Sequence, residues 1–274
     1  MIKVAYPGGA AAHSAAAAER LFPEERELVS LETFADVVDA AVSGSVAYGV
    51  LPIENSLVGP VAETHDLLYD AQLSIVAETS IPIRHHLVAR GPLAESEIRV
   101  IRSHPVALEQ CRKLLGRLNG VRAIAASTTA DAAAQVAESD TPGEAAIASE
   151  RAAAIFGLQV IEHDVGDHPE AFTRFVSIAT HTRIDHESEA WRTAFSFVTD
   201  HKSGALLGAI EPFARHGLDL VQLVSRPIPH SPWKYRFDAV LAGHPLEPMT
   251  RNAFAEVRAH VRELRILGSY PAGT

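Results

Sequence analysis

Apolar runs and helical segments alternate along the first part of the chain. The pattern predicts strands at residues 2–6, 27–31 and 46–53, separated by helices at 13–21 and 34–42. Strands that alternate with helices predict a parallel α/β sheet. The residues that follow the third strand therefore fall at a carboxyl end, where open α/β sheets bind their ligands.

The same alternation continues after two strands in close succession, which look like a crossover from one lobe into another. The predicted elements are strands at 73–79, 81–89, 98–102, 121–126, 145–148 and 158–164, and helices at 106–118, 130–138 and 150–156. The chain then returns to a strand that begins near Thr173. Two crossovers and one return strand predict a two-lobed fold like that of type II periplasmic binding proteins, with a ligand site in the cleft.

The last third of the chain has a different order of elements. A charged stretch at residues 183–190 is typical of a linker. Beyond it, within residues 191–274, the pattern predicts strand, helix, strand, strand, helix and strand, which is the ferredoxin-like order. We therefore expect a two-lobed domain at residues 1–182, with one lobe at about 1–80 and 166–182 and the other at about 81–165, before this smaller domain.

Hydroxyl and amide side chains stand at the predicted strand ends, just before helices. Such positions can bind a carboxylate, because the first N–H groups of a helix have no partner within it. The alternative is that these side chains only cap helices, and Asn55 with Ser56 is expected to cap a helix at residues 57–69. The candidate residues are Ser14, Asn55, Ser56, Ser103, Ser127, Thr128 and Thr129.

Thr173 and Arg174 stand where the return strand begins. A hydroxyl beside a guanidinium presents a proton donor and a fixed positive charge to an anionic ligand. Taken alone, the pair is better explained as a β-branched residue that opens a strand and a solvated arginine.

Charge and cysteine content narrow the function classes. The formal net charge of −10 argues against general nucleic-acid binding, which needs a basic surface, so an anionic substrate would need a local positive site. No apolar run approaches the ~20 residues that span a bilayer, and we expect neither a membrane span nor a signal peptide. The single cysteine, Cys111, excludes an internal disulfide and suits a reducing cytoplasm.

Metal and nucleotide sites are only weakly indicated. His85 and His86 are adjacent, so in a strand they would point to opposite faces, and no third ligand lies near them in the sequence. Gly8 and Gly9 follow the first strand, but no third glycine stands at the spacing of a dinucleotide fingerprint. Hydrolase and P-loop motifs do not occur. We therefore predict no metal and no cofactor.

Motifs that occur in a fixed order resemble the prephenate dehydratase family and its arogenate dehydratase relatives. They are Pro-Ile-Glu-Asn-Ser at residues 52–56, Thr-Arg-Phe at 173–175 and, in the last domain, Gly-Ala-Leu at 204–206 with Ser-Arg-Pro at 225–227. The last two resemble the ligand-binding motifs of an ACT domain. Ser-His-Pro at 103–105, with Gln110 and Cys111 downstream, also matches the family, and the resemblance extends from residue 4 to residue 271.

This resemblance implies a cytoplasmic lyase of L-phenylalanine biosynthesis. Its substrate would be prephenate, which loses its ring hydroxyl as water and its ring carboxylate as carbon dioxide to give phenylpyruvate. Thr173 would polarise the leaving hydroxyl, Arg174 would hold a carboxylate or brace the loop, and Gln110 and Phe175 would join the substrate-binding residues. The ACT domain would bind phenylalanine as an effector and assemble a homodimer or homotetramer. The predicted effector residues are Gly204, Ala205, Leu206, Ser225, Arg226 and Pro227.

The chain departs from the family pattern at three places. Residues 170–172 are Glu-Ala-Phe where the family has an asparagine before Thr-Arg-Phe, and the loop after the first strand is Pro-Gly-Gly-Ala-Ala-Ala-His-Ser. Val224 replaces the glutamate that precedes Ser-Arg-Pro in the family. Three alternatives therefore stay open: an arogenate dehydratase, a prephenate decarboxylase that leaves the ring non-aromatic, and a two-lobed ligand sensor without catalysis.

Overall fold

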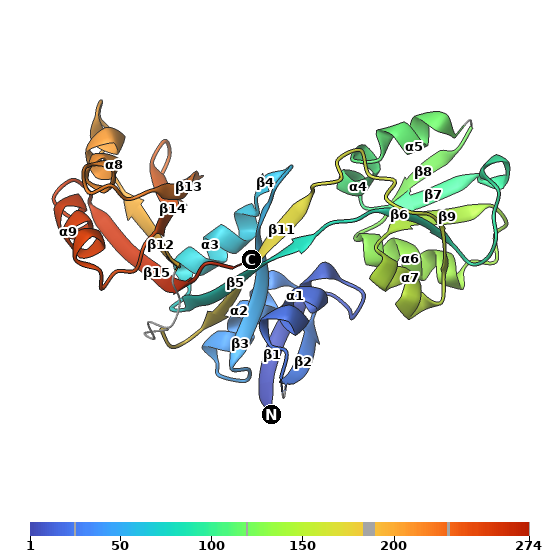
Figure 1. Ribbon diagram of the computed structural model, residues 1–274, viewed down its shortest axis with the longest axis horizontal. Coiled ribbons are helices and arrows are strands. Elements are labelled where there is room, and N and C mark those ends of the chain that lie inside the picture. The colour runs from blue at the N-terminus through green and yellow to red at the C-terminus, as the bar shows by residue number, and fades with distance from the viewer. Residues whose placement is uncertain (25, 119, 183–189, 229–230, 274) are drawn as a thin grey trace. The chain divides into compact units, whose positions relative to one another are not determined.

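The computed structural model describes residues 1–24, 26–118, 120–182, 190–228 and 231–273, which form two compact units (Figure 1). The first unit contains Met1–Pro7, Ala17–Ser80 and Arg174–Thr274, and the second contains Gly8–Ala16 and Ile81–Thr173. The predicted linker at 183–190 lies outside the described residues except for Ala190. No helix in the described ranges is long and apolar enough to cross a membrane.

The first unit is built on a six-stranded sheet with the strand order β2-β1-β3-β11-β5, to which the short β4 is added beside β3. β1 is parallel to both β2 and β3, which confirms the parallel arrangement predicted from the alternation. The elements are β1 (Ile2–Pro7), α1 (His13–Leu21), β2 (Arg26–Leu31), α2 (Phe34–Val42), β3 (Tyr48–Asn55), β4 (Gly59–Pro60), α3 (Ala62–Asp70), β5 (Ser74–Pro82) and β11 (Phe172–Ala179).

Helix α2 illustrates why several predicted ranges agree with the structure. The Thr33 hydroxyl accepts a hydrogen bond from the Asp36 N–H, and the Asp36 carboxylate accepts one from the Thr33 N–H, which closes a capping box. Val37, Val38 and Ala41 recur at helical spacing and are buried in the core of the unit. The start signal and the periodicity agree, and the helix spans the predicted residues 34–42.

The helix expected at residues 57–69 begins later, so that prediction was wrong. Asn55 Oδ1 accepts hydrogen bonds from the N–H groups of Leu57 (3.0 Å) and Val58 (3.1 Å), which closes a turn, and β4 then pairs with the end of β3. Helix α3 starts at Ala62 with Val61 in the cap position. A side chain that can cap a helix can equally close a local turn, and here the turn prevails.

The second unit has a five-stranded sheet with the order β10-β6-β9-β7-β8. β7 is parallel to β8 and β9, whereas β6 is antiparallel to β9 and β10 because the chain enters and leaves the unit through β6 and β10. The elements are β6 (His86–Ala89), a 3-10 turn (Glu95–Glu97), β7 (Val100–Ser103), α4 (Pro105–Glu109), α5 (Arg112–Arg117), β8 (Arg122–Ala125), α6 (Thr129–Glu138), β9 (Glu144–Ala148), α7 (Glu150–Phe156) and β10 (Gln159–Glu162).

The single helix predicted at residues 106–118 is two helices, α4 and α5, with a break at Cys111. The Cys111 backbone leaves the helical region (φ −125, ψ 37), and the Asp167 carboxylate accepts hydrogen bonds from the N–H groups of Arg112 (2.9 Å) and Lys113 (3.3 Å). A carboxylate from a distant segment thus caps a second helix start. The periodic pattern of residues 106–118 gives no sign of this long-range cap.

The C-terminal part has the predicted β-α-β-β-α-β order, and its antiparallel sheet is arranged β13-β14-β12-β15, which is ferredoxin-like. Helices α8 and α9 cover the face of this sheet that is turned away from α3 (Figure 1). The core on that face is rich in aromatic rings, with Phe195, Phe213 and Phe254 in mutual contact. The elements are β12 (Trp191–Val198), α8 (Ala205–Arg215), β13 (Leu220–Pro227), β14 (Tyr235–Ala242), α9 (Pro248–Val257) and β15 (Glu263–Pro271).

The other face of this C-terminal sheet shares a hydrophobic core with the first sheet. Ala194, Val240, Leu267 and Tyr270 belong to the same buried cluster as Leu51 and other residues of the first sheet and its helices. β15 approaches β5 so closely that a Cβ at Gly268 would lie 2.1 Å from the Ile75 carbonyl oxygen. The absence of a side chain at Gly268 is therefore required by packing as well as by its backbone conformation (φ 149).

Candidate active site and effector domain

Arg174, which follows Thr173 on β11, forms an ion pair across the first sheet. Its Nη1 lies 3.3 Å from Oε2 of Glu54 at the end of β3, and the two side chains are 24% and 28% exposed. The neighbouring Phe175 is buried in the sheet. The Thr-Arg-Phe and Pro-Ile-Glu-Asn-Ser segments are thus joined by a contact through Glu54 that the two motifs by themselves do not predict.

The end of β3 is also tied to helix α3. The Thr64 hydroxyl donates to the Pro52 carbonyl (2.6 Å), and the Val61 N–H donates to the Ile53 carbonyl (2.9 Å). Thr64 is fully buried. The turn formed by Asn55 and Ser56 is therefore held by contacts with both β4 and α3.

Three of the predicted hydroxyl residues of the second unit have structural hydrogen bonds. Ser103 is fully buried and donates to the Ile147 carbonyl (2.7 Å), which joins β7 to β9, and His104, not Ser103, is the cap residue of α4. Thr128 caps α6 by accepting from the Asp131 N–H (2.9 Å), as the capping interpretation predicted. Ser127 donates to the Asp131 carboxylate (2.5 Å).

The remaining polar candidates of this unit lie at helix ends. Thr129 is the first residue of α6, and Ser14 is the second residue of α1. Gln110 ends α4, and its side-chain oxygen lies 2.9 Å from Nε2 of His85. The backbone carbonyl of Gln110 accepts a hydrogen bond from the Asp167 N–H (2.7 Å), so Gln110 connects the segments before β6 and after β10.

A pocket of about 220 Å³ lies within the second unit. Its polar lining comes from His13, Arg84, His86, Ser149, Glu150 and Arg151. His13 begins α1, and Arg84 and His86 lie between β5 and the first residue of β6. The other three residues surround the start of α7. Sequence reasoning missed His13, Arg84 and Arg151, since three distant segments have to be brought together before the two arginines become neighbours of one cavity.

Two contacts fix the walls of this pocket. The Arg151 Nε donates to the Ala10 carbonyl (2.7 Å), which holds the guanidinium against the loop before α1. The Ile83 N–H donates to the Ala171 carbonyl (2.8 Å), so the wall that carries Arg84 runs beside the segment that leads to Thr173. The pocket and Thr173 belong to the same unit and share this stretch of backbone.

The imidazole of His13 is held neutral. Burial, together with the smaller contributions of the neighbouring His85 and Arg151, lowers the pKa of His13 to about 4. A neutral imidazole offers one donor and one acceptor without adding charge to the pocket.

His85 and His86, considered above as metal ligands, are both buried in the second unit. His85 lies between β5 and β6 and contacts Gln110, whereas the Nδ1 of His86 accepts from the Asp164 N–H (3.1 Å) and its ring packs edge-on against His163. Burial is the main cause that lowers the pKa of each. The described residues contain no group of three or more His, Cys, Asp or Glu side chains that could hold a metal ion.

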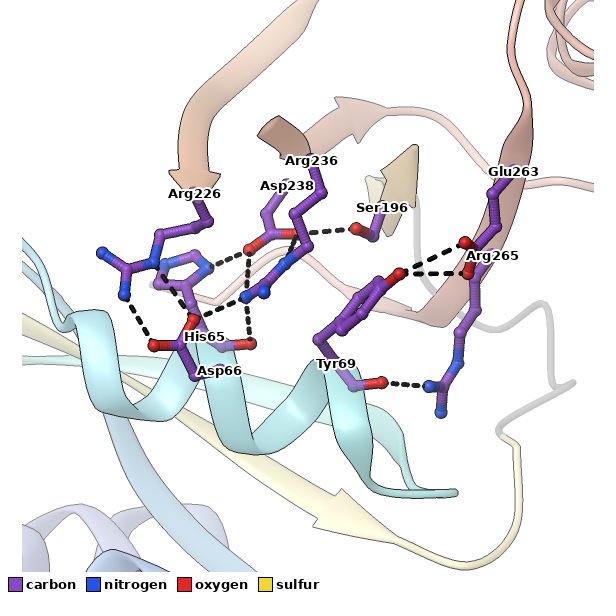
Figure 2. Close-up of polar contacts among 9 residues, drawn as sticks. All are labelled: His65, Asp66, Tyr69, Ser196, Arg226, Arg236, Asp238, Glu263 and Arg265. Atoms are coloured by element: carbon purple, nitrogen blue, oxygen red, sulfur yellow. Dashed lines mark hydrogen bonds and ion pairs between the residues drawn. The ribbon is translucent and has the colours of Figure 1, made fainter. Parts of the chain in front are cut away.

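The predicted effector residues are divided between two places. Gly204 (φ 80) caps α8, and Ala205 and Leu206 begin that helix. On β13 the side chains alternate, so Ser225 and Pro227 are exposed whereas Arg226 points to the opposite face. Arg226 is engaged there with helix α3 of the first sheet (Figure 2).

Figure 2 shows that two arginines of the C-terminal sheet share one carboxylate of α3. Arg226 donates to Asp66 from Nε (3.2 Å) and Nη2 (2.6 Å), and Arg236 donates to Asp66 from Nη2 (2.8 Å). Burial alone would raise the pKa of Asp66, but the hydrogen bonds from both arginines outweigh it and lower the pKa. Asp66 is therefore a carboxylate at neutral pH.

Arg236 is 1% exposed, and its charge is fully surrounded. It donates to Asp238 (3.2 Å) and to the His65 carbonyl (3.0 Å), and its guanidinium lies 4.3 Å from the centre of the Tyr69 ring. Asp238 also accepts from Ser196 (2.7 Å) and lies 3.2 Å from Nδ1 of His65. A buried charge needs such complete pairing to be tolerated.

Comparison with known proteins agrees with the geometry. A family model described as "Prephenate dehydratase" matches residues 4–183. The chain is 34% identical over 282 residues to "Arogenate dehydratase/prephenate dehydratase 2, chloroplastic" of Arabidopsis thaliana, an alignment that covers 100% of this chain and 74% of the relative.

Several solved structures resemble the whole chain, two of them at about 30% identity. The prephenate dehydratase of Arthrobacter aurescens in complex with L-Phe superposes with a TM-score of 0.90 at 29% identity, covering 99% of this chain and 90% of the other. A protein described as GqqA, a novel type of quorum-quenching acylase, superposes with a TM-score of 0.87 at 30% identity, covering 98% and 97%. With its motifs, fold and family match in agreement, the chain belongs to the prephenate dehydratase family.

Proposed function

We propose that the protein is a prephenate dehydratase, which converts prephenate to phenylpyruvate, carbon dioxide and water. One observation carries this proposal. Thr173 of the Thr-Arg-Phe motif stands beside Arg174, and Arg174 is paired at 3.3 Å with Glu54 of the Pro-Ile-Glu-Asn-Ser motif. This pairing gives the Thr-Arg-Phe strand a fixed position relative to the Asn55 turn. The names of the curated relatives support the same reaction.

The reaction needs little chemistry from the protein. The bond between the ring and its carboxylate breaks, its electron pair enters the ring, and the bond to the ring hydroxyl breaks as the hydroxyl takes up one proton and leaves as water. The gain of aromaticity supplies the driving force. A threonine hydroxyl is a weak acid, so Thr173 acts by hydrogen bonding to the departing oxygen, where charge develops in the transition state. Because Arg174 is already paired with Glu54, its role is to brace this strand.

The C-terminal domain is the proposed site of phenylalanine control and of self-association. Gly204 offers a backbone without a side chain at the start of α8, where an amino acid carboxylate can approach. β13 is an edge strand, and its Val221 and Leu223 are 38% and 40% exposed, which suits pairing with a second copy in a homodimer or homotetramer. The complex of the Arthrobacter relative with L-Phe supports this effector. Light scattering with and without phenylalanine measures the assembly.

The cellular location that we propose is the cytoplasm. The lone Cys111 is buried as a free thiol, which suits a reducing compartment.

The decisive experiment supplies the purified protein with prephenate and, separately, with arogenate. Phenylpyruvate and carbon dioxide formed from prephenate in equal amounts are the expected products. Carbon dioxide with a non-aromatic keto acid would identify a decarboxylase instead, and turnover of arogenate alone would identify an arogenate dehydratase. Binding of either compound without turnover would make the protein a sensor.

A further inference from the structure

A small cavity lies between the first sheet and the C-terminal sheet, within the first unit. Its volume is about 20 Å³, and its apolar wall consists of residues from both sheets and from α3. The polar part of the wall comes from α3, β11, β13, β14 and β15, which contribute His65, Arg174, Gln222, Asp238 and Tyr270. The cavity therefore lies where helix α3, the strand of the Thr-Arg-Phe motif and the strand proposed to bind the effector meet.

Two buried nitrogen atoms of this wall have no hydrogen-bond partner among the residues that the structure describes. They are Nε2 of His65, a side chain that is 5% exposed, and the side-chain Nε2 of Gln222. A buried polar group without a partner has lost its hydrogen bonds to water, which costs free energy. Native proteins contain few such groups, and buried water molecules commonly satisfy them. Two such atoms on the wall of one cavity point to a bound molecule that both of them contact.

The hydrogen-bonding character of the two nitrogens specifies this molecule. The amide nitrogen of Gln222 is a donor, so its partner must accept. Nδ1 of His65 lies 3.2 Å from Asp238 (Figure 2). Burial alone would raise the pKa of Asp238, but the hydrogen bonds from His65 and Ser196, with the charge of Arg236, outweigh it and lower the pKa. The Asp238 carboxylate therefore accepts the Nδ1 proton, and Nε2 of the neutral imidazole is an acceptor that needs a donor.

The volume and the charges around the cavity favour water over other ligands. About 10–15 Å³ is enough for one water molecule, whereas a substrate ring or an amino acid needs far more space. A metal cation is disfavoured by the Gln222 donor and by the positive charge of Arg174. The Asp238 carboxylate disfavours an anion in the same way. Water carries no charge and both donates and accepts hydrogen bonds.

We propose that this cavity binds at least one ordered water molecule, which accepts a hydrogen bond from Gln222 and donates one to Nε2 of His65. The water joins β13 to α3, in addition to the ion pair of Arg226 with Asp66, because Gln222 and Arg226 lie on the same face of β13. A water-mediated contact is enthalpically nearly as favourable as a direct hydrogen bond. The inference does not depend on the proposed reaction, since it concerns contacts within the first unit alone.

A high-resolution crystal structure of the full chain tests whether the water is bound. We expect an electron-density peak in the cavity at hydrogen-bond distance, about 2.7–3.2 Å, from Nε2 of both His65 and Gln222. The peak should be lost or displaced in the structure of Gln222→Met, because methionine has a similar length but no amide donor. A parent structure without a peak in contact with both nitrogens would overturn the proposal.

Thermal unfolding of the same variant tests whether the hydrogen bond from Gln222 is formed. The loss of this bond should lower the Tm of Gln222→Met by about 2–4 °C. If the amide has no partner, its replacement removes only the cost of burying it, and an equal or higher Tm would contradict the proposal. Gln159→Met is the matched control, because Gln159 is an exposed strand residue whose substitution should leave the Tm unchanged.

Discussion

Arg226 of β13 and Asp66 of α3 form a bidentate ion pair, with Nε 3.2 Å from Oδ1 and Nη2 2.6 Å from Oδ2. Arg226 belongs to the Ser-Arg-Pro segment predicted to bind an effector, and α3 is bonded at its start to the strand that ends in Glu54 and Asn55. One ion pair thus connects the strand proposed to bind the effector to the helix that supports the Asn55 turn. Such a contact can transmit an effector signal if its geometry differs between two arrangements of the protein.

Replacement of Asp66 by asparagine is expected to uncouple phenylalanine from catalysis. The amide keeps the size of the side chain, but it carries no negative charge and cannot form ion pairs with the two arginines. Phenylalanine should therefore leave kcat/KM almost unchanged in this variant. Calorimetry should still detect phenylalanine binding. Glu263→Gln is the control, because Glu263 accepts from Tyr69 on the same helix without touching Arg226. An unchanged phenylalanine response in Asp66→Asn would show that the signal takes another route.

Thr173→Ala should fold normally and lose most of its turnover. Removal of one positioned donor to a developing charge typically lowers kcat by about 10²–10³. Thr173→Ser keeps the hydroxyl and should recover a large part of the rate. Steady-state kinetics with prephenate and circular dichroism on the same preparations provide the comparison. If the alanine variant turns over at the parent rate, Thr173 has no part in the reaction.

Arg236→Met should destabilise the first unit strongly. The variant leaves the buried Asp238, 3% exposed, without its cationic partner, and the loss of one partner of a buried ion pair costs about 3–5 kcal/mol. Denaturant unfolding followed by circular dichroism measures the free energy. Lys3→Met removes an exposed pair with Glu27 and should change stability little. A small effect of Arg236→Met would mean that Asp238 gains water or a proton when the arginine is removed.

His13 should make the stability depend on pH between about 4 and 6.5. The folded-state pKa of His13 is lowered to about 4 from its ordinary 6.5, so in this range the unfolded chain binds a proton that the folded protein does not. The free energy of unfolding therefore keeps its full value with respect to His13 above pH 6.5, and it falls as the pH drops toward 4. His13→Gln should therefore show a smaller loss of Tm on acidification than the parent.

The exposed His201 provides the control for this pH experiment. His201→Gln should follow the parent curve, while the carboxylates and the other buried histidines contribute equally to all three proteins. A parent and a His13→Gln variant with parallel curves would mean that His13 titrates in the folded protein as it does in the unfolded chain.

Cys111 should be inert in the folded protein. Burial raises the pKa of this thiol to about 12, with a further contribution from the charge of Asp167, and only the thiolate is a strong nucleophile. Iodoacetamide at neutral pH should leave the folded protein unmodified and label it in denaturant, as measured by mass spectrometry. Rapid labelling without denaturant would reveal that the break between α4 and α5 opens.

Local patterns were sufficient to predict the elements whose start and packing signals lie within a few residues. Helix α2 is such a case, because Thr33, Asp36 and the buried valines all lie within one short segment. The ferredoxin-like order of the C-terminal part was predictable for the same reason. The break at Cys111 could not be predicted in this way. The carboxylate that accepts a hydrogen bond from the Arg112 N–H belongs to Asp167, which lies 55 residues away in the sequence.

The candidate site was predictable only where a motif names its residues. Thr173 and Arg174 were identified in this way, whereas the partner Glu54 required the pairing of β3 with β11 to become apparent. The pocket arginines lie on separate segments with no shared motif, and Asp66 and Arg226 are 160 positions apart. A single sequence holds no signal for such pairs, since chain distance says nothing about which surface charges meet after folding.

The core shared between Leu51 of the first sheet and Ala194, Val240, Leu267 and Tyr270 of the C-terminal sheet limits how the chain can be divided. An independent domain has its own hydrophobic core, so its removal leaves the core of the neighbouring domain covered. Removal of residues 191–274 would strip one wall from the core of the first sheet and leave Asp66 without both of its arginines. A substitution in this shared core therefore alters the packing of the first sheet and of the C-terminal sheet at once.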